Sequence, residues 1–472
     1  MISLSLAEVA KLCGGQLASP SDKDVVIDRC VVADSRAVAT GALFVAVRGA
    51  RVDGHDFATQ AVAAGAAAVL ASRPVDVASV LVDDTVLGLG LLARGYLARL
   101  DAAVVGITGS SGKTSTKDLL AQVLGAAGPT VSPVGSFNTE VGVPLTVLRA
   151  DADTRFLVLE MSARGVGHIA YLCGVATPRI GVVLNVGAAH IGEFGSREVV
   201  AQAKGELVEA LAPDGVAVLN ADDPLVAAMR SRTQAQVITF GLTPSADVHA
   251  SDVVLDELAR PRFRLHTPSG SADVRLGLHG AHHVSNALAA VSAALELGVS
   301  VEATAQALGR AEPLSHWRME VSTRPDGVTI VNDAYNANPE SMRAALAALA
   351  SMGRSGPRAR RTWAVLGEMA ELGLHSEAEH FDTGATVAAG GVDRLVVVGQ
   401  AASAIADGAV RGGFSSSDIE CLAGADEAVT FLAPRLEPGD VVLVKASRSA
   451  DLQQVAQRLL ATGTDAGVGA DA

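Results

Sequence analysis

Apolar residues along this chain fall into short continuous runs that alternate with stretches of helical period. In the middle of the chain these runs predict buried strands at 102–108, 156–159, 180–185, 217–220 and 237–240. Helical patterns follow or separate them at 113–124, 196–211, 281–297 and 301–308. Continuous apolar strands that alternate with helices are typical of a sheet covered on both faces, so this region predicts a mainly parallel sheet.

The same alternation continues on either side. The first part predicts a helix at 6–13, a strand near 25–32 and a helix at 56–64, which indicates a small α/β unit. The last part predicts strands at 328–332, 362–366, 395–398 and 441–445, with helices at 341–350, 377–389 and 451–460. That pattern is Rossmann-like. Because 472 residues exceed what one core usually organises, we predict an α/β protein of three domains. They are a small domain (1–100), a central P-loop domain with a mainly parallel sheet (101–314) and a C-terminal Rossmann-like domain (315–472).

Composition favours folded domains. Apolar residues make up 49% of the chain and charged residues 19%, which is enough to build sizeable cores. The net charge of −14 argues against non-specific binding to nucleic acid. No uncharged apolar run reaches the roughly 18 residues of a membrane span, and the first residues lack the pattern of a secretory leader. The four cysteines are far apart in sequence, which favours neither a zinc site nor a disulfide framework. We expect a cytoplasmic protein with no stable membrane association.

A glycine-rich string, GITGSSGKTS at 106–115, follows the first central strand and opens a predicted helix. This context is typical of a loop that cradles phosphate with backbone N–H groups. Lys113 is placed to neutralise the β- and γ-phosphates of ATP, and Thr114 offers a hydroxyl to Mg²⁺, with Ser115 as a second hydroxyl. The strict phosphate-loop pattern would put glycine at Ile107, so this is a variant loop. The predicted nucleotide-binding residues here are Gly109, Ser110, Ser111, Gly112, Lys113, Thr114 and Ser115.

Together with further strings, this loop resembles the Mur ligase family, whose members activate a carboxylate with ATP and couple it to an amine. The first domain contributes DSR and LFVAVRGARVDGHDF. The central domain contributes FNTEVGVPLTVL, LEMSARGVGHI, LNVGAAHIGEFGS and HGAHHVSNALAA, and the last domain NDAYNANPESM, VLGEMAELG and VKASRS. NDAYNANPESM and VLGEMAELG are most similar to the members that add D-alanyl-D-alanine. The resemblance covers nearly the whole chain. It implies an ATP- and Mg²⁺-dependent ligase that joins D-alanyl-D-alanine to UDP-N-acetylmuramoyl-tripeptide, through an acyl phosphate, in peptidoglycan precursor synthesis.

Two residues that follow central strands are implied by the resemblance to bind metal. Glu160 ends the run FLVLE, and the carboxyl ends of strands in doubly wound sheets face the ligand crevice, where a carboxylate suits Mg²⁺. His190 follows the run GVVLNVGAA, and the resemblance makes it a ligand of a second metal or a neighbour of phosphate. A loop histidine is otherwise most often just hydrogen-bonded, and imidazole is an unusual ligand for Mg²⁺.

Lys204 lies in the predicted helix EVVAQAKGELVEAL, soon after the His190 loop. A free ammonium there would repel Mg²⁺. The resemblance implies a lysine that some family members carbamylate with CO₂, which converts a cation into an anionic oxygen ligand. The alternative is a solvated helix lysine near Glu206 and Glu209. The resemblance thus assigns catalysis to Lys113, Glu160, His190 and Lys204, and metal binding to Thr114 and the last three of these.

The resemblance also assigns substrate contacts. Asn286 would contact the adenine of ATP, while Arg318 and Asp333 of the third domain would hold phosphate and ribose, which implies domain closure. The uridine-diphosphate pocket would use Ser35, Arg36 and Arg48, and the muramoyl-peptide would meet Asn138, Thr139 and Glu140. The dipeptide would meet Tyr335, Asn336, Asn338, Ser341, Lys445, Ser447 and Arg448. The structural alternatives are a helix-cap asparagine, solvated surface arginines and Asx-turn capping.

Other functions share parts of this pattern. Another Mur-type ligase, such as the one that adds the third residue, or a folylpolyglutamate synthase would carry a similar loop, but NDAYNANPESM argues against both. A P-loop ATPase that drives a partner by hydrolysis is the alternative from another class, and the substrate dependence of ADP release would separate it. The sequence does not distinguish meso-diaminopimelate from L-lysine as the third peptide residue. Nor does it give the state of Lys204 or the oligomeric state, for which a monomer is the working expectation.

Overall fold

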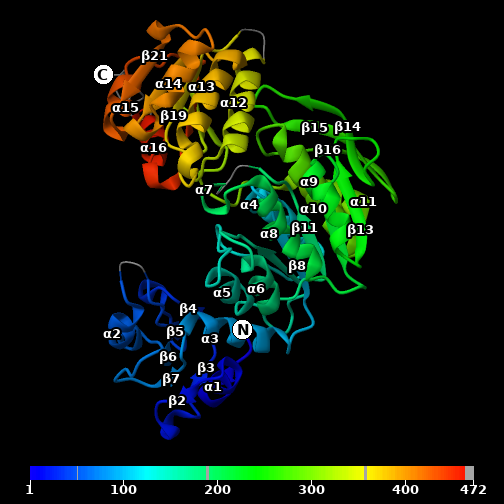
Figure 1. Ribbon diagram of the computed structural model, residues 1–472, viewed down its shortest axis with the longest axis vertical. Coiled ribbons are helices and arrows are strands. Elements are labelled where there is room, and N and C mark those ends of the chain that lie inside the picture. Colours follow the sequence, from blue (N-terminus) through cyan, green and yellow to red (C-terminus); the bar gives the residue numbers. More distant parts are fainter. Residues whose placement is uncertain (50–51, 188–190, 356–358, 463–472) are drawn as a thin grey trace, which may run out of the picture.

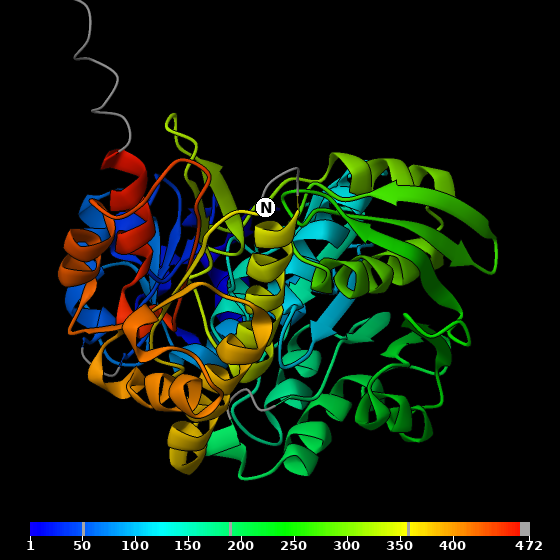
Figure 2. The same cartoon turned by 90° about the horizontal axis from the view of Figure 1, so that it is seen from above.

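A computed structural model describes residues 1–49, 52–187, 191–355 and 359–462. The chain runs from an N-terminal part at the foot of Figure 1, through a central part, to a C-terminal part at the top. Figure 2, seen from above, shows the C-terminal and central parts side by side. Each part has its own sheet, and this α/β architecture of several largely parallel sheets confirms the predicted fold class. The residue boundaries between domains stay a prediction.

The central sheet has nine strands in the order β16-β15-β14-β13-β12-β11-β8-β10-β9. Neighbours from β9 to β14 pair in parallel, whereas β14, β15 and β16 pair antiparallel. The strands are β8 (Ala103–Thr108), β9 (Thr130–Val131), β10 (Phe156–Glu160), β11 (Ile180–Val183), β12 (Val216–Asn220), β13 (Gln236–Gly241), β14 (Val248–Leu255), β15 (Pro261–Thr267) and β16 (Gly270–Arg275). In β10, Phe156 and Val158 enter the core on one face of the sheet, and Leu157 and Leu159 enter the core on the other. This two-sided burial explains why the run is continuously apolar.

Helices cover both faces of the central sheet. One face packs on α4 (Lys113–Gly125), α10 (His282–Glu296) and α11 (Val301–Arg310). The other packs on α5 (Gly142–Val147), α6 (His168–Val175) and α8 (Arg197–Glu209). Two short helices, α7 (Ile191–Phe194) and α9 (Pro224–Ala227), complete this part. The loops that follow β8, β10 and β11 leave the same end of the sheet, because these strands are parallel neighbours.

The N-terminal part has a five-stranded sheet in the order β2-β7-β6-β5-β4 and a separate β1–β3 pair. Its elements are β1 (Leu4–Ser5), α1 (Leu6–Cys13), β2 (Gln16–Leu17), β3 (Val26–Ile27), β4 (Val31–Val32), β5 (Leu43–Val45), α2 (Ala58–Ala63), β6 (Ala68–Ala71), β7 (Ser79–Leu81) and α3 (Thr85–Leu97). Helix α3 packs against α5 and α6 of the central part. There the Tyr96 hydroxyl donates to Ala150 O over 2.6 Å. The N-terminal sheet is therefore anchored to the central part through a buried helix.

The C-terminal sheet has six strands in the order β17-β18-β22-β19-β20-β21, all parallel except β17. They are β17 (Glu320–Thr323), β18 (Thr329–Asn332), β19 (Thr362–Leu366), β20 (Arg394–Val398), β21 (Ile419–Leu422) and β22 (Val441–Lys445). One face packs on α12 (Pro339–Arg354), α13 (Ser376–Gly390) and α14 (Ala404–Arg411), and the other on α15 (Ala425–Leu432) and α16 (Gln453–Thr462). At the C-terminal ends of β18 and β22 the chain lies next to the central part.

Several elements differ from the sequence prediction, which did not include β5, β6, β17, β21, α3, α14 or α15. The strand expected near 25–32 is split, because β3 pairs with β1 while β4 joins the five-stranded sheet. The antiparallel meander β14–β16 was not predicted, since its strands alternate buried and exposed positions and form no continuous apolar run. In the described parts of the chain, no helix is both long and apolar enough to cross a bilayer.

Candidate functional site

The phosphate loop turns directly from β8 into α4. Gly112 caps α4 with φ +80°, a left-handed conformation that glycine adopts without strain. A Cβ atom on Gly112 would lie only 2.5 Å from Asn286 Oδ1, so the missing side chain also lets α10 approach the loop. Asn286, predicted for adenine, is therefore brought against the loop that was predicted for phosphate.

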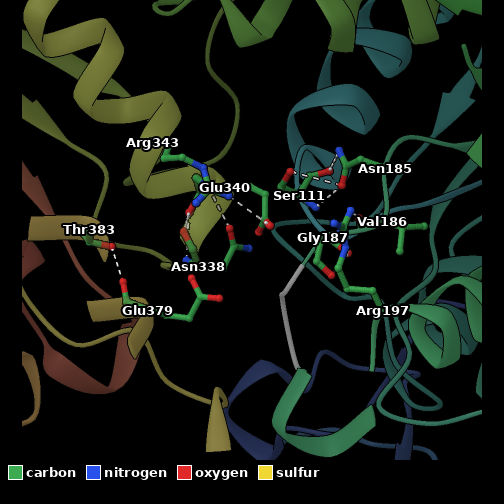
Figure 3. Close-up of polar contacts among 12 residues, drawn as sticks. Ser111, Asn185, Val186, Gly187, Arg197, Asn338, Glu340, Arg343, Glu379 and Thr383 are labelled. Carbon is green, nitrogen blue, oxygen red and sulfur yellow. Dashed lines mark hydrogen bonds and ion pairs between the residues drawn. The ribbon is translucent and has the colours of Figure 1, made fainter. Parts of the chain in front are cut away.

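The loop is fixed from outside by the segment that follows β11. Asn185 Oδ1 accepts the Ser111 N–H over 2.9 Å, and Asn185 Nδ2 donates to Ser111 O over 3.2 Å. The Ser110 hydroxyl accepts the Gly187 N–H over 2.8 Å. Figure 3 shows Asn185 facing Ser111 in this way. The backbone that would cradle phosphate is thus held by side-chain hydrogen bonds before any ligand binds.

Lys113 folds back over the loop. Its ammonium donates to Gly109 O over 2.7 Å. Burial lowers the pKa of Lys113, the charge of Glu160 partly offsets this, and the charge of Arg318 lowers the pKa further. A buried cation aimed into a phosphate loop is favoured when an anion enters, because the anion replaces the lost solvation.

Glu160 joins two loops at the end of β10. One carboxylate oxygen accepts the Thr114 hydroxyl over 2.9 Å, and the other accepts Asn138 Nδ2 over 2.7 Å. The side chain is almost completely buried, with 1% of the residue surface exposed. A buried carboxylate and a hydroxyl side by side form the kind of oxygen donor pair that suits a small divalent cation.

Lys204 is buried on α8, with only 3% of its surface exposed. Burial and the nearby Lys113 hold its pKa well below the usual value. The Glu206 carboxylate turns away and accepts the N–H groups of Gly167 (2.5 Å) and Ala170 (2.9 Å) at the start of α6. Glu209 pairs with Arg232 instead. Lys204 is therefore a buried amine beside a second one, and not a solvated helix residue.

His190 lies outside the described residues, so its predicted role stays a prediction. Within the part of the chain that the structure describes, no three histidine, cysteine or acidic side chains are grouped closely enough to hold a metal ion by themselves.

The third domain supplies the opposite wall. Asp333 accepts the Lys445 ammonium over 2.7 Å and the Met319 N–H over 3.1 Å, and Lys445 also donates to Asn336 O over 2.9 Å. Asn338 and Ser341 bond reciprocally as a capping box at the start of α12. The Arg318 guanidinium lies over the Tyr335 ring at 4.4 Å. Arg318 Nε is buried with no hydrogen-bond partner in the described chain, which leaves it a donor for a ligand.

A cavity of about 400 Å³ lies between the two walls. The hydroxyls of Ser136 and Tyr335 form a hydrogen bond from one wall to the other. The cavity brings together most of the predicted residues: Ser110, Ser111, Gly112, Lys113, Thr114, Ser115, Asn138, Thr139, Glu140, Glu160, Asn286, Arg318, Asp333, Tyr335, Asn336, Asn338, Ser341 and Lys445. Residues distant in sequence thus line one polar cavity that is partly open to solvent.

Several predicted residues do not line this cavity, among them Lys204, which is buried on α8. Gly109 contributes its carbonyl behind Lys113. Ser447 is buried and accepts the Ala370 N–H over 2.9 Å, while Arg448 stacks on the Trp317 ring at 4.2 Å. These two contacts order the third-domain wall rather than face the cavity.

The predicted uridine-diphosphate residues lie in the N-terminal part. Ser35 and Arg36 form a short 3-10 turn, where the Asp34 carboxylate accepts the Arg36 guanidinium over 2.7 Å. The hydrogen bonds from Arg36 lower the pKa of Asp34 to about 2. Arg48 is exposed and forms a single β-bridge with Asp53. They do not line the cavity, and their substrate role stays a prediction.

Sequence reasoning missed Asn185, His282 and Glu340, which belong to the site or support it. All three line the cavity, and Asn185 also holds the phosphate loop by its hydrogen bonds to Ser111. All three lie inside strings that the sequence singled out, but a string does not show which of its side chains face the ligand. Burial lowers the pKa of His282 to about 4, so the ring is neutral at ordinary pH.

Three family descriptions match the chain in order. They are the Mur ligase family catalytic domain (29–91), the Mur ligase middle domain (107–294) and the Mur ligase glutamate ligase domain (317–448). The UDP-N-acetylmuramoyl-tripeptide--D-alanyl-D-alanine ligase of Mycobacterium tuberculosis is 50% identical, over 98% of this chain and 99% of that protein. The protein of the same name in Escherichia coli is 36% identical, over 98% of this chain and all of that one.

Solved structures agree with this match. A crystal structure of MurF from Acinetobacter baumannii has a TM-score of 0.87 at 33% identity, covering 98% of this chain and 99% of that one. MurF ligase from Thermotoga maritima in complex with ADP has a TM-score of 0.81 at 32% identity, covering 93% and 99%. The phosphate loop, Glu160 and the third-domain wall meet at one cavity. Because relatives of this family also match almost the full length of the chain, this chain belongs to the Mur ligase family.

Proposed function

We propose that this chain is an ADP-forming ligase that joins D-alanyl-D-alanine to UDP-N-acetylmuramoyl-tripeptide, in the synthesis of peptidoglycan precursors. The observation that carries the proposal is one shared cavity. The phosphate loop lines one side of it, and the amide-rich third-domain wall lines the other. The full-length relatives named for this reaction support the same choice of substrates. We place the enzyme in the cytoplasm, acting as a monomer.

ATP binds with its phosphates on the loop before α4. Lys113 and the loop N–H groups neutralise the γ-phosphoryl group as the peptide carboxylate attacks it, which gives an acyl phosphate and ADP. Asn286 beside Gly112 contacts the adenine, and Arg318 and Asp333 contact phosphate and ribose from the other domain. The unpartnered Arg318 Nε supports this role, since it needs an acceptor that a nucleotide supplies.

The residues present fit magnesium. The Thr114 hydroxyl and the Glu160 carboxylate, 2.9 Å apart, are the oxygen donors that would hold it, with His190 as the family-based partner outside the described residues. When bound, Mg²⁺ neutralises charge on the transferring phosphoryl group. Asn138 holds the second Glu160 oxygen, and so keeps the carboxylate facing the loop.

Lys204 is proposed to be carbamylated. Its amine attacks CO₂ to form a carbamate, the amine proton leaves to solvent, and the side chain becomes an anionic oxygen ligand. The buried position and the lowered pKa support this proposal, because only the neutral amine reacts with CO₂. The change also removes the repulsion between Lys204 and Lys113.

The Lys204 proposal has its own test. Lys204→Ala should lower turnover at least about 100-fold, with partial rescue by acetate or formate, as expected when a metal ligand is lost. Wild-type protein equilibrated with ¹³CO₂ should give a carbamate carbon signal by NMR that the variant lacks. Normal activity of the unsupplemented variant, or no such signal in the wild type, would rule the carbamate out.

The dipeptide amine, in its neutral form, then attacks the acyl phosphate; the C–O bond to phosphate breaks, the nitrogen loses a proton to the departing phosphate or to solvent, and the new amide bond forms. The third-domain cluster Tyr335, Asn336, Asn338 and Ser341 holds the dipeptide, while Lys445, Ser447 and Arg448 order that wall. Asn138, Thr139 and Glu140 contact the peptide of the nucleotide substrate, and Ser35, Arg36 and Arg48 contact its uridine diphosphate. The third peptide residue is left open.

A coupled assay of ADP release tests the function. ADP should be released, one molecule for each amide bond formed, only when ATP, the nucleotide tripeptide and D-alanyl-D-alanine are all present. Lys113→Ala should lower the rate at least about 1000-fold while the protein stays folded, because the buried cation at the phosphates is gone. Turnover without an amine acceptor would instead indicate an ATPase, and turnover with single amino acids but not the dipeptide would exclude this substrate.

A further inference from the structure

The incoming dipeptide presents an ammonium group that the site must receive. The pKa of an α-amino group is about 8, so the dipeptide arrives mostly protonated at neutral pH. Placing that charge in a cavity only partly open to solvent is costly unless a carboxylate faces it. The inference below rests on the proposed function, because it concerns how the same cavity receives its amine substrate.

Four acidic residues line the cavity: Glu140, Glu160, Asp333 and Glu340. Glu160 holds Thr114 and Asn138, and Asp333 pairs with Lys445 at 2.7 Å. Glu140 lies 3.2 Å from His168 on the central-domain side. Glu340 stands on the third-domain wall, within the same helix start as Asn338 and Ser341. Of these four carboxylates, Glu340 is therefore the one that lies at the start of α12 with Asn338 and Ser341 of the dipeptide cluster.

The backbone around Glu340 is well fixed. It is the second residue of α12, between Pro339 and the capping-box residue Ser341, and a carboxylate is favoured in the first turn of a helix by the helix dipole. Arg343 on the next turn approaches the Glu340 carboxylate to 3.4 Å. The Glu340 side chain lines the cavity and keeps 29% of its surface exposed, with its Oε2 atom buried.

The Glu340 carboxylate reaches across to the phosphate side. A Cβ atom on Gly187 would lie 2.5 Å from Glu340 Cδ and 2.6 and 2.8 Å from its two oxygens, so the carboxylate occupies the space beside Gly187 that a side chain there would fill. The Gly187 N–H is in turn bound by the Ser110 hydroxyl of the phosphate loop. Figure 3 shows Glu340 extending from α12 toward Ser111 and Gly187. The Glu340 carboxylate thus lies against Gly187, and Gly187 is hydrogen-bonded to Ser110 of the phosphate loop, on which the acyl phosphate forms.

We propose that Glu340 is the anionic contact for the ammonium end of the incoming dipeptide, and that it places the amine beside the phosphate loop. The contact with Glu340 directs the dipeptide nitrogen toward the central domain, where Gly187 lies against the phosphate loop.

The test combines a change in the enzyme with a change in the ligand. Glu340→Gln should raise the KM for D-alanyl-D-alanine about 10- to 100-fold, the range expected for a lost charged hydrogen bond, with the KM for ATP changed less than about 2-fold. The ligand change is a dipeptide analogue in which a hydroxyl replaces the amino group, used as a competitive inhibitor. Its Ki should be the same in wild type and variant, since it carries no ammonium.

Two further variants sharpen the result. Glu340→Asp should recover part of the lost affinity. Glu379→Gln, on α13, is the matched control: it removes the same charge nearby but does not line the cavity, and should leave the KM for the dipeptide within about 3-fold. An unchanged KM in Glu340→Gln, or an equal weakening of dipeptide and hydroxyl analogue, would overturn the inference. If wild-type protein shows no dipeptide-dependent ADP release at all, the proposed function fails instead.

Discussion

His282 shows how one buried side chain ties stability to pH. Burial lowers its pKa from 6.5 to about 4, with Asp333 opposing the shift and Lys445 adding to it. In the unfolded chain this histidine binds a proton below about pH 6.5, whereas in the folded protein it does so only below about pH 4. The unfolded state therefore binds more protons between these values, and the folded state loses stability as pH falls through that window.

We predict that His282→Asn reduces this loss. The shift corresponds to roughly 3 kcal/mol of unfolding free energy between pH 6.5 and 4, and the variant should lack a large part of it. Urea unfolding at pH 7.0 and 4.5 measures the difference directly. The neighbouring His283, whose pKa is also lowered by burial, remains in the variant and keeps some pH dependence. Equal pH dependence in both proteins would contradict the prediction.

At the scale of elements, the phosphate loop depends on the segment after β11. Asn185 makes two hydrogen bonds to the Ser111 backbone, while Asp223 accepts the Val186 N–H over 2.8 Å and Arg197 donates to Val186 O over 2.7 Å. Figure 3 shows Asn185, Val186 and Arg197 together at this segment. Asp223 at the start of α9 and Arg197 of α8 thus hold a segment that itself holds the phosphate loop.

We predict that Asn185→Ala loosens the loop before ATP binds. The KM for ATP should rise about 10-fold, equivalent to ~1.4 kcal/mol, because binding must now order the loop. Ser292→Ala removes a buried hydrogen bond to Leu288 O on α10 and serves as the control, with loss of stability but an unchanged KM. Steady-state kinetics with varied ATP decides, and a KM that moves equally in both variants would show that the brace has no specific role.

The sequence predicted most of the buried strands of the central and C-terminal sheets, but it missed the short buried strands β5 and β6 and the partly exposed meander β14–β16. The runs at β8, β10, β11 and β22 are apolar, except for the last residue of β8, β10 and β22, because helices cover both sides of their sheets. The β14–β16 meander leaves part of each strand exposed, and alternation of that kind is easily taken for loop. Most site residues were predictable because they lie in specific strings near strand ends. The direction of Glu340 and the burial of Lys204 were not, since both depend on packing between distant segments.

At the scale of the whole molecule, catalysis depends on how closely the central and C-terminal parts approach. Besides the Ser136–Tyr335 contact, backbone meets backbone where α7 faces the 3-10 turn Gly373–His375. A Cβ atom on Gly192 would lie 2.6 Å from Gly373 N and 2.9 Å from Gly373 Cα. Backbone atoms cannot move aside as a flexible side chain can. Glycine at this point therefore sets the spacing of the two walls.

We predict that Gly192→Ala holds the two parts slightly apart. The values of kcat/KM for ATP and for the dipeptide should fall together, about 10- to 100-fold, because the third-domain residues no longer reach the phosphate loop. Gly174→Ala on α6 is the matched control, since a Cβ there meets no atom within 4 Å. Small-angle X-ray scattering should give a larger radius of gyration for Gly192→Ala alone, and saturating substrates should partly restore the wild-type value by favouring the closed arrangement. Unchanged scattering with unchanged kinetics would mean that the two parts adjust at this contact without cost, and that the spacing of the walls is set elsewhere.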